Sequence, residues 1–117
     1  MSSEKAISHF RNMKSGMQSL EEQFHHAMIG VADFANAHGF GIRFKQMIKR
    51  HGAREAAKRL LATQEIQTGL MRLWEMKSLS KSMEALVIQE RFRPLFTEEE
   101  IAEAKRRLDE LGYFKAG

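Results

Sequence analysis

Five histidines and a group of glutamates are the residues of this chain that could take part in chemistry. His25 and His26 are adjacent, so on a helix their side chains point about 100° apart and do not hold one metal ion from a single face. No other histidine has a histidine three or four residues away, and no His-Glu-x-x-His motif occurs. The sequence therefore predicts no metal site.

The glutamates lie at the start of a predicted helix, where the helix dipole favours negative charge without any catalytic role. The chain has no cysteine. It also shows no nucleophile paired with a base, no phosphate-binding glycine loop and no carboxylate pair in an apolar setting. We therefore expect a protein that is not an enzyme and that uses no cofactor. The glutamates concerned are Glu98, Glu99, Glu100 and Glu103.

Positive charge is the stronger signal, because it is concentrated in the middle of the chain. The net charge of +4 divides into −1 for residues 1–41, +7 for residues 42–81 and −2 for residues 82–117. A basic surface of this kind is typical of contact with phosphate or an acidic protein, although helices also need solvated faces. The cations that we predict to bind the nucleic-acid backbone are Arg43, Lys45, Lys49, Arg50, Arg54, Lys58 and Arg59.

These cations are expected to contact the backbone of DNA or RNA rather than the bases. No exposed aromatic residue is expected among them, which disfavours base stacking on single strands. A helix-turn-helix would need the helix around Trp74 to enter a groove, yet that helix is mainly apolar and offers base edges only Gln67, Arg72 and Lys77. We therefore expect Trp74, the only tryptophan, to lie in the core.

The elements that must position these residues are helical. With one proline, eight glycines and little period-two alternation, the sequence predicts an all-α fold: a long N-terminal helix followed by a compact bundle of about five short helices. Ser80 is the expected N-cap of one short helix, and Thr97 with Glu100 forms an expected capping box for the last. The predicted helices span residues 3–37, 42–51, 53–62, 69–76, 81–89 and 98–111, with a linker at 90–94.

The first helix carries an unbroken heptad pattern of apolar residues, which is typical of a seam between helices. Such a seam does not specify whose helix it meets, so the helix either forms a homodimer or folds back along its own domain. The domains that we expect are residues 1–38, the heptad helix, and residues 39–117, a helical domain centred on Trp74. The predicted seam contains Phe10, Met13, Met17, Leu20, Phe24, Ala27, Val31 and Phe34.

Four segments between residues 52 and 100 resemble a family of short helical proteins from bacteria and phages that has no assigned activity. The segments with the most specific motifs are Leu73-Trp74-Glu75 and Pro94-Leu95-Phe96-Thr97-x-Glu99-Glu100. The other two are Gly52-x-x-x-Ala56-Ala57-Lys58-Arg59-Leu60-Leu61 and Glu84-Ala85-Leu86-Val87. The resemblance covers residues 42–113 and implies no catalytic residue.

The length of the chain and its first residues indicate the number of domains and the cellular location. A chain of 117 residues has the length of one domain. The first residues lack an apolar signal core and no window approaches a membrane span, so we expect a cytoplasmic protein without membrane contact. We expect a non-enzymatic homodimer that binds nucleic-acid backbone or a nucleoprotein complex. The alternative is an adaptor or inhibitor of the phage or mobile-element type that binds a protein through the first helix.

Overall fold

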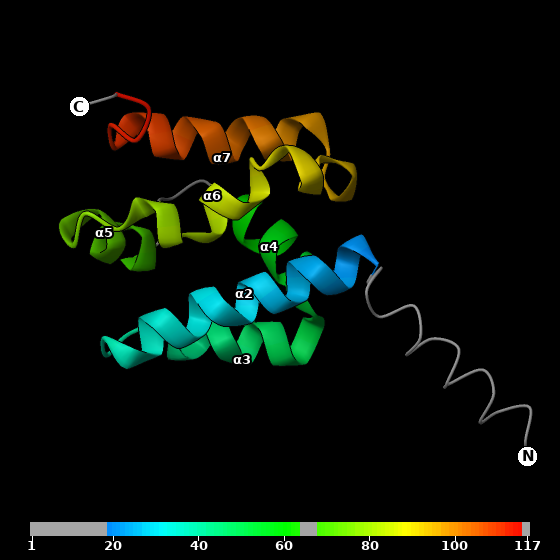
Figure 1. Cartoon of the computed structure of the whole chain (residues 1–117), viewed down its shortest axis with the longest axis horizontal. Coiled ribbons are helices and arrows are strands. Elements are labelled where there is room, and N and C mark those ends of the chain that lie inside the picture. The colour runs from blue at the N-terminus through cyan, green and yellow to red at the C-terminus, as the bar shows by residue number, and fades with distance from the viewer. Residues whose placement is uncertain (1–18, 64–67, 116–117) are drawn as a thin grey trace, which may run out of the picture.

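The computed structural model describes residues 19–63 and 68–115, and every regular element in this part of the chain is a helix (Figure 1). The all-α prediction is therefore confirmed. Two core clusters hold the helices together, a larger one under α2, α3, α4, α6 and α7 and a smaller one under α5. The elements are α2 (Leu20–Ala37), α3 (Ile42–His51), α4 (Ala53–Leu61), α5 (Thr68–Glu75), η2 (Leu79–Lys81), α6 (Met83–Val87), η3 (Glu90–Leu95) and α7 (Glu98–Glu110).

Helix α2 begins later than the heptad pattern predicts. Ser19 has an extended backbone, with ψ of 155°, and its hydroxyl accepts a hydrogen bond from the Glu22 amide while the Glu22 carboxylate accepts one from the Ser19 amide. This capping box starts a helix, so the prediction of one continuous helix from residue 3 to residue 37 is wrong at Ser19. The predicted C-terminal end is confirmed, since α2 stops at Ala37 and Gly39 has a φ of +85°. The seam residues Phe10, Met13 and Met17 lie outside the described residues.

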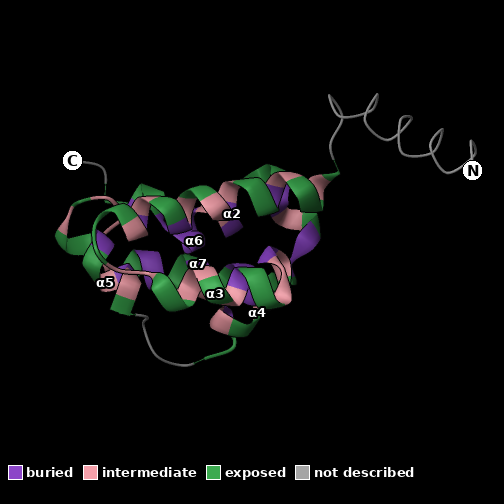
Figure 2. Cartoon of the chain, turned by 90° about the horizontal axis from the view of Figure 1, so that it is seen from below, coloured by how far each residue is buried: buried purple, intermediate pink, exposed green. Residues whose placement is uncertain are grey.

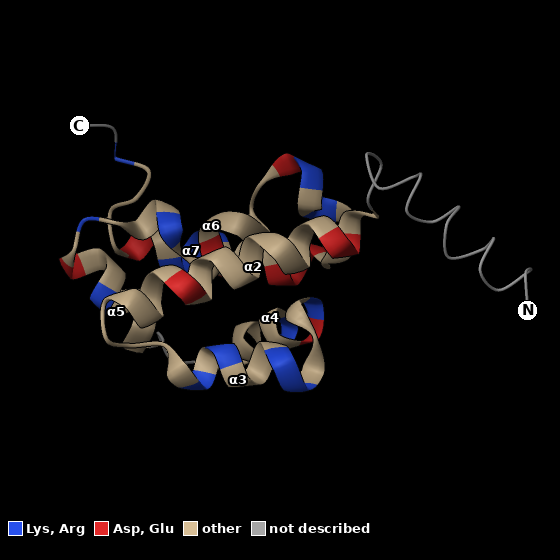
Figure 3. Ribbon diagram, turned by 60° about the horizontal axis from the view of Figure 1, so that its bottom comes forward, with Lys and Arg blue, Asp and Glu red and all other residues tan. Residues whose placement is uncertain are grey.

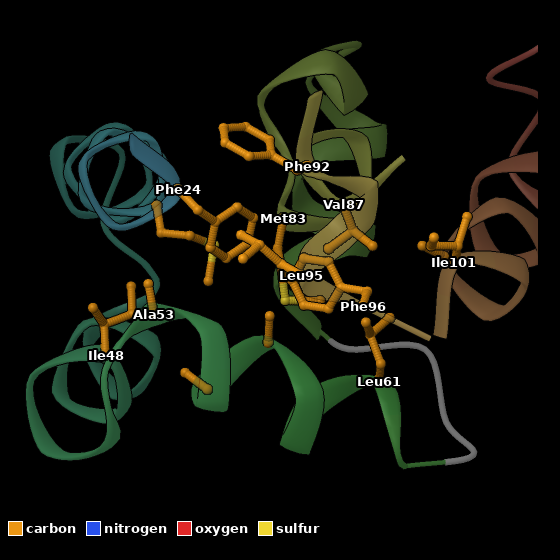
Figure 4. Packing of buried hydrophobic residues seen from close by; sticks show 14 of the residues in the cluster. Phe24, Ile48, Ala53, Leu61, Met83, Val87, Phe92, Leu95, Phe96 and Ile101 are labelled. Atoms are coloured by element: carbon orange, nitrogen blue, oxygen red, sulfur yellow. The ribbon is translucent and has the colours of Figure 1, made fainter. Parts of the chain in front are cut away.

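The described part of the seam packs within its own chain. Phe24 is 0% exposed, and its ring meets those of Phe92 and Phe96 edge to face at centroid distances of 5.1 Å each (Figure 4). Of the two alternatives for the seam, Phe24 therefore follows the second, packing along its own domain, and is not available to an interface between chains because its surface is already covered. The buried stripe of α2 is also rotated from the heptad positions, and Leu20, Val31 and Phe34 are only half-buried. The stripe consists of Phe24, Met28, Ala32 and Ala35.

This packing joins the two predicted domains into one core. Phe24, Met28 and Ala32 of α2 share a cluster with Ile48 of α3 and with buried residues of the later helices. Figure 2 shows the same arrangement, with buried residues on the sides where the helices face one another. The division at residue 38 therefore does not hold for α2, because its apolar stripe needs the rest of the chain to cover it.

Helices α3 and α4 meet at Gly52, close to the predicted boundaries. Gly52 has a φ of +85°, a backbone conformation that favours glycine, and its amide donates to the Ile48 carbonyl at 2.8 Å. Ala56 and Ala57 are both 0% exposed. Their small side chains let α4 lie close to its neighbours, which sets the position of the cations on both helices.

Trp74 is not in the core, and the prediction that the domain is centred on it is wrong. Its side chain is 45% exposed, whereas Leu70 and Leu73 of the same helix are buried in the second cluster. Adjacent helical residues point about 100° apart, so once Leu73 faces inward Trp74 points away. Burial of Leu70 and Leu73 therefore determines which side of α5 faces the core.

In the C-terminal part of the chain, the structure agrees best with the sequence prediction at the last helix, α7. The helix predicted at residues 81–89 is instead a 3₁₀ turn followed by the short α6, whose N-cap is Ser82 rather than Ser80. The predicted linker at 90–94 is itself a 3₁₀ helix. The capping box of Thr97 and Glu100 at the start of α7 is confirmed, and Gly112, with φ of +80°, ends the helix as expected.

Candidate nucleic-acid interface

The seven cations predicted to bind the nucleic-acid backbone fall into two groups in the structure. Four of them form ion pairs with carboxylates of the same chain. The nitrogen–oxygen distances are 3.0 Å for Lys45–Asp33, 3.6 Å for Arg54–Glu21, 2.8 Å for Lys58–Glu100 and 3.2 Å for Arg59–Glu55.

Two of these cations, Lys58 and Arg54, also connect α4 to the C-terminal half of the chain. The Lys58 ammonium donates to both oxygens of Glu100, at 2.8 and 3.0 Å. Burial tends to raise the pKa of Glu100, but hydrogen bonds from Lys58 and Thr97 outweigh it and hold that pKa below its ordinary value. Arg54 Nε donates to the Leu95 carbonyl at 3.0 Å. Lys58 and Arg54 therefore have structural roles that compete with phosphate binding.

The remaining three cations, Arg43, Lys49 and Arg50, all belong to α3. Each is exposed, and within residues 19–63 and 68–115 none has an ion-pair or hydrogen-bond partner. Helix α3 has no acidic residue of its own (Figure 3). Arg43 and Arg50 are two helical turns apart, a rise of about 10 Å, so the set extends along most of one short helix. This outer face of α3, defined by Arg43, Lys49 and Arg50, is the candidate interface.

Two histidines come together in a way that their sequence positions did not indicate. His25 of α2 and His51 of α3 both line a polar hollow of about 320 Å³ beside Gly52, together with Glu21 and Glu55. In the described part of the chain, no group of three or more metal-binding side chains has a geometry that could hold a metal ion. We therefore describe this hollow as a polar surface feature near the turn between α3 and α4, and we assign it no metal ion.

Arg107 is a residue that the sequence did not single out. A positive charge near the end of a helix is favoured by the helix dipole and is usually solvated, but the Arg107 side chain is 0% exposed. Its Nη2 donates to the Leu60 carbonyl at 3.0 Å and to the Thr63 carbonyl at 2.8 Å, at the end of α4. One signal was present: Arg107 follows Ala104 by three residues and therefore lies on the apolar side of α7.

The carboxylates around Arg107 complete a buried network. Arg107 Nε donates to Glu103 at 2.7 Å and Nη1 donates to Glu84 at 3.1 Å. Hydrogen bonds from Arg106, and then from Arg107, overcome burial and lower the pKa of Glu103 to about 2. Burial raises the pKa of Glu84 despite the nearby guanidinium. The network joins α4, α6 and α7, and because Arg107 and Glu84 are both buried we assign it a structural role.

In residues 19–63 and 68–115, no helix combines the length and the apolar composition that crossing a membrane requires.

Comparisons with known proteins do not bear on the candidate interface. The family resemblance of the Leu73-Trp74-Glu75 and Pro94–Thr97 segments stays a prediction. No protein-family model, no curated protein and no solved structure matches this chain.

Proposed function

We propose that the protein binds the phosphate backbone of nucleic acid through the outer face of α3. The observation that carries the proposal is that Arg43, Lys49 and Arg50 are exposed on one helix that contains no acidic residue. Cations without an internal ion pair bind phosphate favourably, because binding releases the counterions condensed on the nucleic acid and breaks no ion pair within the protein. A paired cation would first have to leave its carboxylate, so its contact with phosphate contributes less binding free energy.

The same reasoning favours duplex over single-stranded nucleic acid. Single-strand binding without sequence preference combines cations with aromatic side chains on which bases stack. The exposed aromatic side chains in the described part of the chain are Trp74 on α5 and Phe114 after α7, and neither belongs to α3. Backbone contact without stacking suits a duplex, in which the bases are already stacked and the phosphates line both strands.

The test compares polyanions of matched charge. Fluorescence anisotropy should show binding of the full chain to a mixed-sequence DNA duplex, with an affinity that does not depend on sequence and falls as salt rises. Poly-glutamate of equal charge should bind more weakly. If poly-glutamate binds as tightly as the duplex, the α3 face serves an acidic protein. Absence of duplex binding at low salt would contradict the proposal.

The adaptor alternative retains one supporting observation. Tryptophan is enriched among the residues that dominate protein–protein binding, and Trp74 is 45% exposed. This support comes from α5 and not from the first helix, because the stripe of α2 is covered by its own chain. A pull-down in which Trp74→Ala, but not Lys49→Ala, removes a protein partner would favour the adaptor function.

A further inference from the structure

A cavity of about 610 Å³ lies between α2, α3, α5 and α6. Small-molecule sites in proteins commonly enclose about 300 to 1,000 Å³ and are lined mainly by apolar side chains. This cavity fits that description, and Figure 1 shows the elements whose side chains form its walls. Its apolar lining includes Val31, Phe44, Met47, Leu70, Leu73 and Met83.

The floor of the cavity and its mouth differ in chemistry. Leu70, Leu73 and Met83 are buried, so they form the part farthest from solvent. Arg43 of α3 and Arg72 of α5 also line the cavity but are exposed, so they stand where it opens to solvent. An apolar floor beneath two cations matches a ligand with an apolar body and an anionic head.

The charges that face the cavity strengthen this assignment. Among the residues that the structure describes, the only acidic one in its lining is Glu84, whose side chain is 4% exposed and forms an ion pair with Arg107. Arg43 has no ion-pair partner within the described residues, and Arg72 lies over the Phe40 ring at 4.7 Å from its centroid. For residues 19–63 and 68–115, the uncompensated charge around the cavity is therefore positive and lies at its mouth.

We infer that this cavity binds a free single-chain carboxylate, with its aliphatic chain on the apolar floor and its head group between Arg43 and Arg72. The site goes beyond the proposed function, because Arg72 and the apolar floor are not part of the outer face of α3. Arg43 is common to both sites, so Arg72 is the residue that distinguishes them.

Isothermal titration calorimetry of the full chain with hexanoate, octanoate and decanoate tests the site. Each added pair of methylenes should tighten binding about tenfold, since each methylene moves from water to the apolar floor. Octanol, which has the same chain without the charge, should bind several times more weakly than octanoate. Equal affinities for octanol and octanoate, or no binding of decanoate, would overturn the inference. So would binding to anionic lipid vesicles without binding to free decanoate.

Variants at the mouth test the role of the cations. Arg72→Gln should weaken octanoate binding about fivefold, as expected for loss of one partly exposed charge, and should leave octanol binding unchanged. Lys105→Gln is the matched control, because Lys105 is an exposed cation on α7 that does not line the cavity. An equal loss in both variants would reflect net charge alone and would overturn the assignment of Arg72.

Gly69 offers a way to fill the cavity without harming the fold. It lies inside α5, and an added Cβ would meet the Phe40 ring at 3.9 Å, an ordinary contact. Gly69→Leu should abolish binding of octanoate and octanol while the melting temperature stays level or rises, because glycine is unfavourable inside a helix. Retained binding would place the site elsewhere. Conversion of a wild-type dimer to a monomer by Gly69→Leu, seen by sedimentation equilibrium, would assign the cavity to a second copy instead.

Discussion

Arg107 and Glu84 form an ion pair in the interior, with Nη1 of the arginine 3.1 Å from Oε2 of the glutamate and side-chain exposures of 0% and 4%. The two residues come from α7 and α6. Arg107 also donates to the carbonyls of Leu60, in the last turn of α4, and of Thr63, just after that helix, so one guanidinium holds three helices together. A buried charge of this kind is tolerated because its donors have acceptors.

We expect removal of Arg107 to be among the most destabilising substitutions in the chain. Arg107→Met should lower the free energy of unfolding by about 3 to 5 kcal/mol, because it leaves the buried Glu84 carboxylate without its charged partner and removes the hydrogen bonds to the Leu60 and Thr63 carbonyls. Urea unfolding followed by circular dichroism measures this. The double substitution Arg107→Met with Glu84→Leu should lower the free energy of unfolding by less than the sum of the two single substitutions. Additive effects would contradict the coupling, and Arg106→Met, at an exposed neighbour, is the control.

The stability of the fold should fall in acid partly through Glu103. Its folded pKa is about 2 against an ordinary value of 4.5, so the unfolded chain takes up the proton first as the pH falls. The stabilisation is therefore complete above about pH 4.5 and is lost as the pH falls through about 2. Melting temperatures between these values should depend less on pH in Glu103→Gln than in the wild type. An unchanged slope in Glu103→Gln would contradict the prediction.

Phe24 should behave as a core residue. Phe24→Ala should lower the free energy of unfolding by about 3 to 5 kcal/mol, because it removes a fully buried ring and its contacts with Phe92 and Phe96. Phe114→Ala is the control, since Phe114 is 48% exposed and its truncation should change stability little. Chemical denaturation measures both. A loss below about 1 kcal/mol in Phe24→Ala would show that α2 is not held in this core.

The salt dependence of duplex binding counts the cations that contact phosphate. Three free cations predict a slope of log K against log salt of about −2.7, whereas all seven predict about −6.3. Arg43→Ala, Lys49→Ala and Arg50→Ala should each make the slope shallower by about one. Arg59→Ala should leave it unchanged, because Arg59 is paired with Glu55. A slope near −6 in the wild type would mean that the ion pairs open on binding.

Self-association rests on the part of the seam that the structure does not describe. We expect the wild type to sediment as a dimer at micromolar concentration, and Met13→Asp with Met17→Asp to sediment as a monomer with an intact thermal transition. Phe24→Lys should instead unfold the chain, because it puts a charge in the core. A monomeric wild type at that concentration would contradict the dimer.

Several features of this protein follow from the sequence alone, because neighbouring residues determine them. The boundaries of α3 and α4 were predicted to within one residue, since Gly52 separates two short runs of helical apolar spacing. The capping box at Thr97 and Glu100 needs only four consecutive residues. The all-α class likewise follows from periodicity. Each of these depends on interactions within about two helical turns, which the order of residues specifies directly.

Tertiary structure alone decided which side chains are buried and which charges are free. Lys58 and Glu100 are 42 residues apart in the chain, and Arg107 and Leu60 are 47 apart, so no local pattern pairs them. Trp74 and Phe24 are both large and apolar, yet one is exposed and the other is in the core. The helical period predicts a stripe but not what covers it, and the rotation of α2 and α5 depends on all the helices that surround them. Of the seven cations that the sequence predicts to bind the nucleic-acid backbone, the packing of the helices leaves three, Arg43, Lys49 and Arg50, without a partner among the described residues.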